Sequence, residues 1–151
     1  MGERARILVV DDDESIREVL TAILEDEGYT VESASTAKRA IEKTGTAFYN
    51  LALIDIRLPD MEGIELLTKM KDPTPKMRKI IITGYPTLHN AVEAVNKGAD
   101  AYIVKPFDME KVLETIKEQL KKQEEAKKYS QEKVAEFIEA RVIELETEKK
   151  L

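Results

Sequence analysis

Five short apolar runs, separated by stretches with helical periodicity, constrain the fold of this chain more than any other feature of its sequence. The runs are rich in β-branched residues and lie at residues 6–10, 29–34, 51–54, 79–82 and 101–104. Strands that are apolar along their whole length are typical of parallel sheets buried on both faces. Helical spacing of apolar residues is found at residues 15–26, 36–43, 63–71 and 88–97 and from residue 108 onward. This alternation predicts a doubly wound α/β fold, with a five-stranded parallel sheet in the order 2-1-3-4-5.

The end of the chain forms a separate compositional block. Residues 121–151 are dominated by Glu and Lys and contain neither Pro nor Gly. We therefore expect one domain over residues 1–120 and a C-terminal helical extension over residues 121–151. Before this block Leu113, Ile116 and Leu120 share one heptad register, and Val134 and Phe137 resume it within the block, although Lys127 and Arg141 fall where a coiled coil needs apolar residues. The surface of the tail that needs a partner comprises Val134, Phe137, Ile138, Val142 and Leu145. Because a polar isolated helix is marginal in water, we expect the tail to pair with a second copy in a homodimer, with a solvated, frayed helix as the alternative.

Charge and composition exclude several classes of function. The formal net charge of −6 and the isoelectric point near 5.0 argue against direct binding to nucleic acid or to anionic membranes. No run approaches the roughly 18 apolar residues of a membrane span, and the N-terminus lacks a signal-peptide pattern, so we expect a cytoplasmic location. The absence of cysteine excludes disulfides and zinc–cysteine sites.

Polar side chains with a chemical use follow the ends of the predicted strands. Asp11 and Asp12 follow the first strand and Asp55 the third, while Thr83 and Lys105 follow the fourth and fifth. Because neighbouring strands lie about 4.8 Å apart, we expect the three carboxylates to meet at the carboxyl edge of the sheet. Oxygen ligands with vacant positions suit Mg²⁺. A carboxylate nucleophile, Asp55, beside a metal, a lysine and a hydroxyl is an arrangement suited to phosphoryl transfer.

Four motifs in order and at matching spacing make the chain resemble the receiver domain of response regulators, the family that includes the chemotaxis regulator. The match extends from Ile7 to about Leu120. The motifs are VVDDD at residues 9–13, LIDIRLPDMEG at 53–63, ITGY at 82–85 and AYIVKPF at 101–107.

The resemblance implies a metal-dependent phosphoacceptor site. Asp55 would be the phosphoacceptor, and Asp12 would bind Mg²⁺ directly. Asp11 would act on the metal either directly or through water, and Arg57 would contribute its backbone carbonyl. The module would take its phosphoryl group from a sensor histidine kinase or a phosphotransfer protein. It would then hydrolyse the group slowly, without being an enzyme that acts on a separate substrate.

The resemblance also implies a switch. Thr83 and Lys105 would contact the phosphoryl oxygens, and Tyr102 would change orientation on activation. The Lys105–Pro106 peptide bond would be cis. Output would pass through a downstream protein target, which the sequence does not name, just as it names neither the cognate kinase nor the stimulus.

Three other functions are compatible with parts of the pattern. A phosphatase of the haloacid dehalogenase type needs a second Asp two positions after the nucleophile, where this chain has Arg57. A flavodoxin-like flavin carrier would place the carboxylates of residues 11–15 against the flavin phosphate, which they would repel. A degenerate receiver that serves as a scaffold is disfavoured by the intact acidic residues, although a scaffolding role is compatible with phosphorylation.

Overall fold

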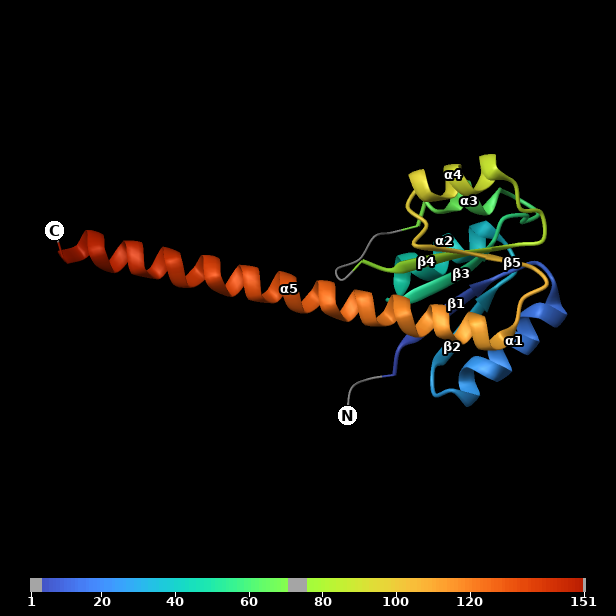
Figure 1. Cartoon of the computed structure of the whole chain (residues 1–151), viewed down its shortest axis with the longest axis horizontal. Helices are drawn as coiled ribbons and strands as arrows, with labels where there is room; N and C mark the ends of the chain where they lie inside the picture. Colours follow the sequence, from blue (N-terminus) through green and yellow to red (C-terminus); the bar gives the residue numbers. More distant parts are fainter. Residues whose placement is uncertain (1–3, 71–75, 151) are drawn as a thin grey trace.

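The structure is a computed structural model, and it describes residues 4–70 and 76–150. Within them a parallel sheet has the strand order β2-β1-β3-β4-β5, and helices alternate with the strands (Figure 1). The strands are β1 (Arg6–Val10), β2 (Thr30–Ala34), β3 (Leu51–Asp55), β4 (Arg78–Thr83) and β5 (Ala101–Val104). The helices are α1 (Glu14–Asp26), α2 (Ala37–Thr46), α3 (Gly63–Leu66), α4 (Leu88–Asn96) and α5 (Met109–Lys150). The fold class and the strand order predicted from the sequence are confirmed.

Two apolar clusters cover the two faces of the sheet, because successive strand residues point to opposite sides. One cluster joins β1, β3 and β4 to α2, α3 and α4, and includes Leu8, Ala52, Ile54, Ile64, Ile81 and Ala94. The other joins the same strands and β5 to α1 and α5, and includes Ile7, Leu53, Ile80, Leu20, Leu24, Val112 and Ile116. The sheet is therefore buried on both sides, as its near-continuous apolar strands predicted.

Local signals set several helix ends. The carboxylate of Asp13 accepts a hydrogen bond from the backbone N–H of Ile16 at 3.1 Å and caps α1. Gly28 and Gly98, just beyond α1 and α4, have φ angles of 97° and 102°, a region that favours glycine. These two residues let the chain leave α1 and α4.

Helix α3 is shorter than the helix predicted over residues 63–71, since it ends at Leu66. Beyond Leu66 the backbone N–H groups of Thr68 and Lys69 bond to carbonyls three residues earlier, in tight turns rather than in an α-helix. The carbonyl of Leu67 accepts a hydrogen bond from the Lys79 ammonium at 3.0 Å, so the polar end of this short helix is satisfied by β4. Residue 71 lies outside the described residues.

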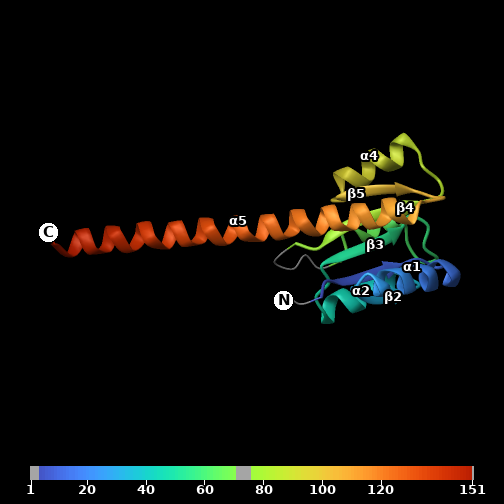
Figure 2. The ribbon, with the colours of Figure 1, turned by 60° about the horizontal axis from the view of Figure 1, so that its bottom comes forward.

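Helix α5 runs without a break from the sheet to Lys150, which confirms the predicted extension of the fifth helix (Figures 1 and 2). Its last buried contact is Gln123, whose amide donates to the carbonyls of Asn50 at 2.9 Å and Lys76 at 2.8 Å. Residues 124–148 are exposed. None of the helices in the described ranges combines the length and the apolar character needed to cross a membrane.

Candidate functional site

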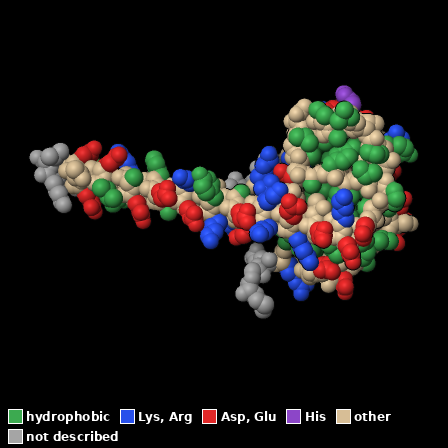
Figure 3. Space-filling view, in the orientation of Figure 1, with side chains coloured by type: hydrophobic (Ala, Val, Ile, Leu, Met, Phe, Trp, Pro, Cys, Tyr) green, Lys and Arg blue, Asp and Glu red, His purple; other side chains and the backbone are tan. Residues whose placement is uncertain are grey.

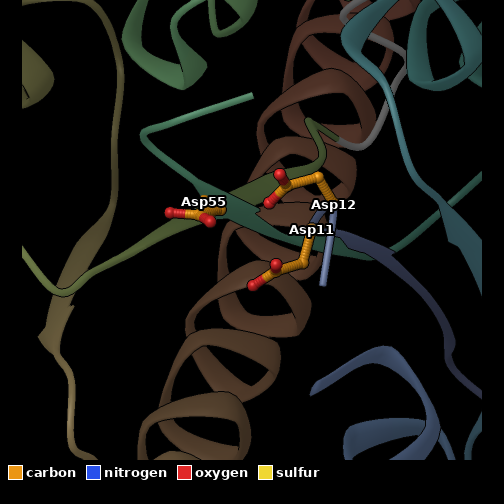
Figure 4. A group of neighbouring side chains, drawn as sticks. All are labelled: Asp11, Asp12 and Asp55. Carbon is orange, nitrogen blue, oxygen red and sulfur yellow. The ribbon is translucent and has the colours of Figure 1, made fainter. Parts of the chain in front are cut away.

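Three carboxylates meet at the carboxyl edge of the sheet. Asp11 follows β1 and Asp55 ends β3, and these strands pair with Val10 opposite Ile54. One carboxylate oxygen from each of Asp11, Asp12 and Asp55 lies within 4.8 Å of the others (Figure 4). The side chains of Asp11 and Asp55 are only 5% and 11% exposed, whereas Asp12 is exposed. We call these three residues the acidic pocket, and their meeting is the arrangement expected from the sequence.

Lys105 places a positive charge beside the acidic pocket. Its ammonium donates to Asp11 Oδ2 at 3.0 Å and lies 3.4 Å from Asp55 Oδ2. The backbone N–H of Lys105 donates to the carbonyl of Thr83 at 2.7 Å, so β4 fixes the start of the lysine side chain. The peptide bond from Lys105 to Pro106 is cis, as the resemblance implied.

The ionisation of these groups is coupled. Burial raises the pKa of Asp55, and the nearby charge of Asp11 raises it further, against the opposing effect of Lys105. For Lys105, burial disfavours the charged ammonium, but the hydrogen bond to Asp11 and the charges of Asp11 and Asp55 outweigh it and raise its pKa. One lysine therefore does not fully balance the two carboxylates, and a second cation would lower the cost of ionising Asp55.

The loop after β3 packs closely against Asp55. The backbone N–H of Arg57 donates to Asp55 Oδ1 at 3.3 Å, and that of Gly63 donates to the carbonyl of Ile56 at 2.7 Å. A Cβ atom at Gly63 would lie 2.1 Å from the backbone oxygen of Asp55. Only glycine fits this position without moving the backbone that carries Asp55.

Two residues that support the acidic pocket were missed by the sequence analysis. Both carboxylate oxygens of Asp60 accept hydrogen bonds, from the backbone N–H groups of Ala37 and Lys38 at 2.9 Å each, and these bonds tie the loop to the start of α2. They lower the pKa of Asp60. The guanidinium of Arg17 donates to the backbone carbonyl of Asp11 at 2.7 Å. Neither contact has a local signal, because the partners lie on different elements or face one another only after folding.

Thr83 and Tyr102 lie on the neighbouring strands. The side chain of Thr83 is fully buried, and its hydroxyl oxygen accepts a hydrogen bond from the backbone N–H of Tyr85 at 2.9 Å. The Tyr102 hydroxyl is buried and makes no hydrogen bond within the described part of the chain. Burial raises the pKa of Tyr102, and the nearby backbone of Thr87 opposes that rise without reaching hydrogen-bond geometry.

Arg57 and Tyr85 stack on each other in the loops that follow β3 and β4. The guanidinium carbon of Arg57 lies 3.6 Å from the ring centre of Tyr85, a cation–π contact between the residues two positions beyond Asp55 and Thr83. Tyr85 is 58% exposed, so this contact lies at the protein surface. The metal-binding role implied for the Arg57 carbonyl stays a prediction.

The chemistry of the acidic pocket fits a hard divalent cation. Three carboxylate oxygens within 4.8 Å of one another supply oxygen ligands only, and the exposed Asp12 leaves room for water at the remaining positions. The residues present could thus hold a metal ion between the ends of β1 and β3.

The fold and the site together define a class of protein: a doubly wound signalling module with an acidic pocket and a lysine at the carboxyl edge of its sheet. The chain belongs to the response regulator receiver domain family of two-component signal transduction, whose sequence profile matches residues 7–117.

Comparisons with single proteins agree with this family. The chain is 41% identical over 119 residues to the transcriptional regulatory protein ZraR of Klebsiella oxytoca, a match that covers 79% of this chain and 27% of ZraR. It is 52% identical to a CheY-like response regulator receiver domain protein of Methanospirillum hungatei, with a TM-score of 0.79 over 82% of this chain and 99% of that structure. The chain thus spans about a quarter to half the length of the curated relatives it matches.

Two further solved structures show states of related receivers. The beryllofluoride-activated NtrC4 receiver domain dimer is 39% identical, with a TM-score of 0.73 over 78% of this chain and 98% of that chain. A response regulator of Burkholderia pseudomallei with a phosphorylated aspartic acid and a calcium ion is 33% identical, with a TM-score of 0.68 over 72% of this chain and 64% of that chain.

Proposed function

We propose that Asp55 accepts a phosphoryl group from a phosphohistidine of a sensor histidine kinase or a phosphotransfer protein, in a reaction that requires Mg²⁺. The observation that carries this proposal is the acidic pocket with Lys105 beside it, since Lys105 lies 3.4 Å from one oxygen of Asp55. The related structure with a phosphorylated aspartic acid and a calcium ion supports the same chemistry.

Each residue of the site has a proposed role. Asp12 and Asp55 bind Mg²⁺ directly, Asp11 binds it directly or through water, and the backbone carbonyl of Arg57 completes the protein ligands. Bound Mg²⁺ supplies positive charge that neutralises phosphoryl oxygens. Lys105 and the hydroxyl of Thr83 contact the remaining phosphoryl oxygens. Because these groups are held by the ends of adjacent strands, little rearrangement is needed before reaction.

The proposed reaction is a displacement at phosphorus. A carboxylate oxygen of Asp55 forms a bond to phosphorus while the bond from phosphorus to the donor imidazole nitrogen breaks, and the electron pair stays on that nitrogen. The product is an acyl phosphate at Asp55 and a free histidine on the donor. Burial raises the pKa of the Asp55 carboxyl, and Lys105 and a bound cation would favour the ionised form that attacks phosphorus.

Phosphorylation is transmitted to a partner protein by a conformational change of the receiver. Phosphorylation adds negative charge that draws the Thr83 hydroxyl towards Asp55, and Tyr102 responds on the adjacent strand. The Tyr102 hydroxyl is buried and makes no hydrogen bond to any described residue, so it can take a new partner without breaking an existing bond to them. A downstream protein target then recognises the altered face, and slow self-dephosphorylation ends the signal. The module thus acts as a phosphoprotein switch rather than as an enzyme with a separate substrate.

The organisation of the chain supports a homodimer. We divide it into a receiver domain at residues 1–120 and a helical extension at residues 121–151, with the last buried contact of α5 at Gln123, close to this boundary. The related receiver dimer is consistent with self-association.

The net charge of −6 argues against direct contact with nucleic acid or a membrane surface, and a cytoplasmic location accompanies the proposed kinase donor.

The acceptor assignment is tested by chemical phosphorylation. Incubation with acetyl phosphate and Mg²⁺ should add one phosphoryl group to the wild-type chain, measured by intact mass, and Asp55→Asn or EDTA should abolish the addition. Asp108→Asn is a matched control on the same side of the sheet, outside the acidic pocket, and should react as the wild type does. Labelling that persists in Asp55→Asn would refute the assignment.

The metal roles are tested by a pair of neighbouring substitutions. Asp12→Ala should weaken Mg²⁺ binding at least about tenfold, a loss of about 1.4 kcal/mol, because it removes a direct ligand. Asp13→Ala should leave the affinity for Mg²⁺ nearly unchanged and reduce stability by about 1 kcal/mol, because Asp13 caps α1. Calorimetric titration and urea unfolding measure both effects, and equal losses of affinity in the two variants would contradict the division of roles.

A further inference from the structure

The part of α5 beyond the receiver, residues 124–148, exposes several large apolar side chains to solvent. Its large apolar side chains are Val134, Phe137, Ile138, Val142, Ile143 and Leu145, and they are between 43% and 71% exposed. Figure 3 shows such side chains along the protruding helix, interleaved with charged ones. Because a helix of this polarity gains stability mainly from packing, this surface points to a partner.

One heptad register turns part of this surface into a seam. Ala135 and Val142 occupy its a positions, and Ile138 and Leu145 occupy its d positions. The second heptad alone, with the β-branched Val142 at a and Leu145 at d, has the combination that favours a two-stranded coil. The register that continues from the receiver would instead place Arg141 in the seam, whereas here Arg141 falls at a flanking g position.

Charge complementarity indicates that a second copy of this chain packs against the seam, and that the two helices run parallel. In a parallel pair, the g position of one helix faces the e position of the next heptad in its partner, so Arg141 meets Glu146 of a second copy, twice in the dimer. An antiparallel pair would bring the e-position glutamates, Glu139 and Glu146, towards each other. Within one chain Arg141 reaches Glu144 at 2.8 Å, an exposed contact that it could exchange at little cost.

The receiver does not stand in the way of this pairing. The residues of α5 that are buried against the sheet are Val112, Ile116, Gln119 and Gln123. At about 100° per residue, the seam points about 90° away from that buried side. The exposed stretch at residues 124–134 also separates the seam from the last buried contact by roughly 18 Å, at about 1.5 Å per residue.

We propose that residues 135–145 form a parallel, two-stranded seam with the same segment of a second copy. This inference rests on the homodimer proposed above and specifies its direction and register. The seam spans less than the roughly three to four heptads of a self-sufficient coiled coil, so the tails pair when association of the receivers raises their effective concentration. Because Gln123 ties α5 to the starts of β3 and β4, the paired tails hold the two receivers at the same end of the dimer.

The direction and the register are tested by disulfide formation in the full chain, which has no native cysteine. In a parallel pair Leu145 faces Leu145, so Leu145→Cys should crosslink at least about tenfold faster than Ile143→Cys, which lies outside the seam. The reaction is followed with and without beryllofluoride and Mg²⁺, at equal protein concentration. Equal rates, or no crosslink under either condition, would overturn the proposal. Crosslinking between Ala135→Cys and Leu145→Cys chains, with none between two Leu145→Cys chains, would show an antiparallel pair and overturn it as well.

A charge exchange provides a second test. Arg141→Glu and Glu146→Arg should each weaken the dimer about tenfold in analytical ultracentrifugation, because each places like charges across the seam. The double variant should restore the wild-type dissociation constant. Glu144→Arg removes the partner of Arg141 within the chain and should leave the dimer intact. Failure of the double variant to recover would refute the parallel pairing.

These tests are separable from the acceptor assignment. Val142→Asp should prevent dimer formation through the tail, while phosphorylation of Asp55, read from intact mass, proceeds as in the wild type. Ile143→Asp adds the same charge one residue away and should affect neither property. A tail variant that loses the dimer and keeps the modification supports the seam, whereas loss of modification in Asp55→Asn alone bears only on the acceptor.

Discussion

Replacing Gly63 with alanine should damage both the stability of the receiver and its reaction with phosphodonors. The loop from Ile56 to Gly63 folds back so closely that a Cβ atom would lie 2.1 Å from the backbone oxygen of Asp55 and 3.0 Å from Ile54 Cγ2. Both contacts belong to β3, the central strand that carries the acceptor. The atom nearest to the added Cβ is the backbone oxygen of Asp55, so no side-chain rotation can relieve this clash.

The size of the effect follows from the distance. The contact must widen from 2.1 Å to at least 3.0 Å, so either the loop or the end of β3 must shift by about 0.9 Å. Overpacking of this kind costs about 1–3 kcal/mol of unfolding free energy. A displacement of about 1 Å at a reacting group lowers a rate about a hundredfold, so phosphorylation of Asp55 by acetyl phosphate should fall by about that factor.

Urea unfolding and intact-mass kinetics measure the two effects. Gly45→Ala is the matched control, because it lies in α2, its Cβ would meet nothing within 4 Å, and alanine there should stabilise the protein by about 0.5–1 kcal/mol. Circular dichroism establishes that each variant is folded before its kinetics are read. If Gly63→Ala unfolds at the wild-type urea concentration and is phosphorylated at the wild-type rate, the close approach of this loop to Asp55 does not govern the site.

Three further predictions concern the residues around the site and the sheet. The stack of Arg57 on Tyr85 offers no acid or amide that could orient a water molecule for hydrolysis. Arg57→Asn with Tyr85→Glu should therefore shorten the lifetime of phospho-Asp55 about tenfold, a change of about 1.4 kcal/mol in the barrier to hydrolysis. If the phosphorylated mass of this variant decays at the wild-type rate, the stack does not control hydrolysis. Gln123→Ala removes two hydrogen bonds to backbone carbonyls and should lower the unfolding free energy by about 2 kcal/mol in urea titrations, whereas equal stability of this variant and the exposed Lys122→Ala would contradict it. Burial raises the pKa of Tyr49 from 10.0 to about 12, and the hydrogen bond to Glu32 is the second cause. The Tyr49 hydroxyl therefore stabilises the fold fully below pH 10 and loses that contribution as the pH rises towards 12. Tyr49→Phe should therefore be less stable than the wild type at pH 8, and a difference between the two proteins that does not shrink by pH 12 would disprove this linkage.

The sequence by itself determined the architecture and the position of the acidic pocket. Both rest on patterns that are local in the chain: apolar runs that can only be buried strands, amphipathic stretches between them, and polar residues at the strand ends. A parallel sheet then brings the ends of β1 and β3 to one edge, whatever the details of packing. The lack of Pro and Gly in residues 121–151 likewise predicted the long α5.

The tertiary structure alone decided several hydrogen bonds between residues far apart in the sequence. The bonds from Asp60 to the start of α2, the Arg17 contact with the Asp11 carbonyl, and the amide of Gln123 on two distant carbonyls depend on side-chain directions and on loop paths. The length of α3 was likewise set by turns beyond Leu66 that the periodicity of residues 63–71 did not reveal. The physical reason is that a periodic pattern reports which face of an element is buried, whereas a hydrogen bond between distant residues requires two positions to be fixed within a few tenths of an ångström, which only the packed chain achieves.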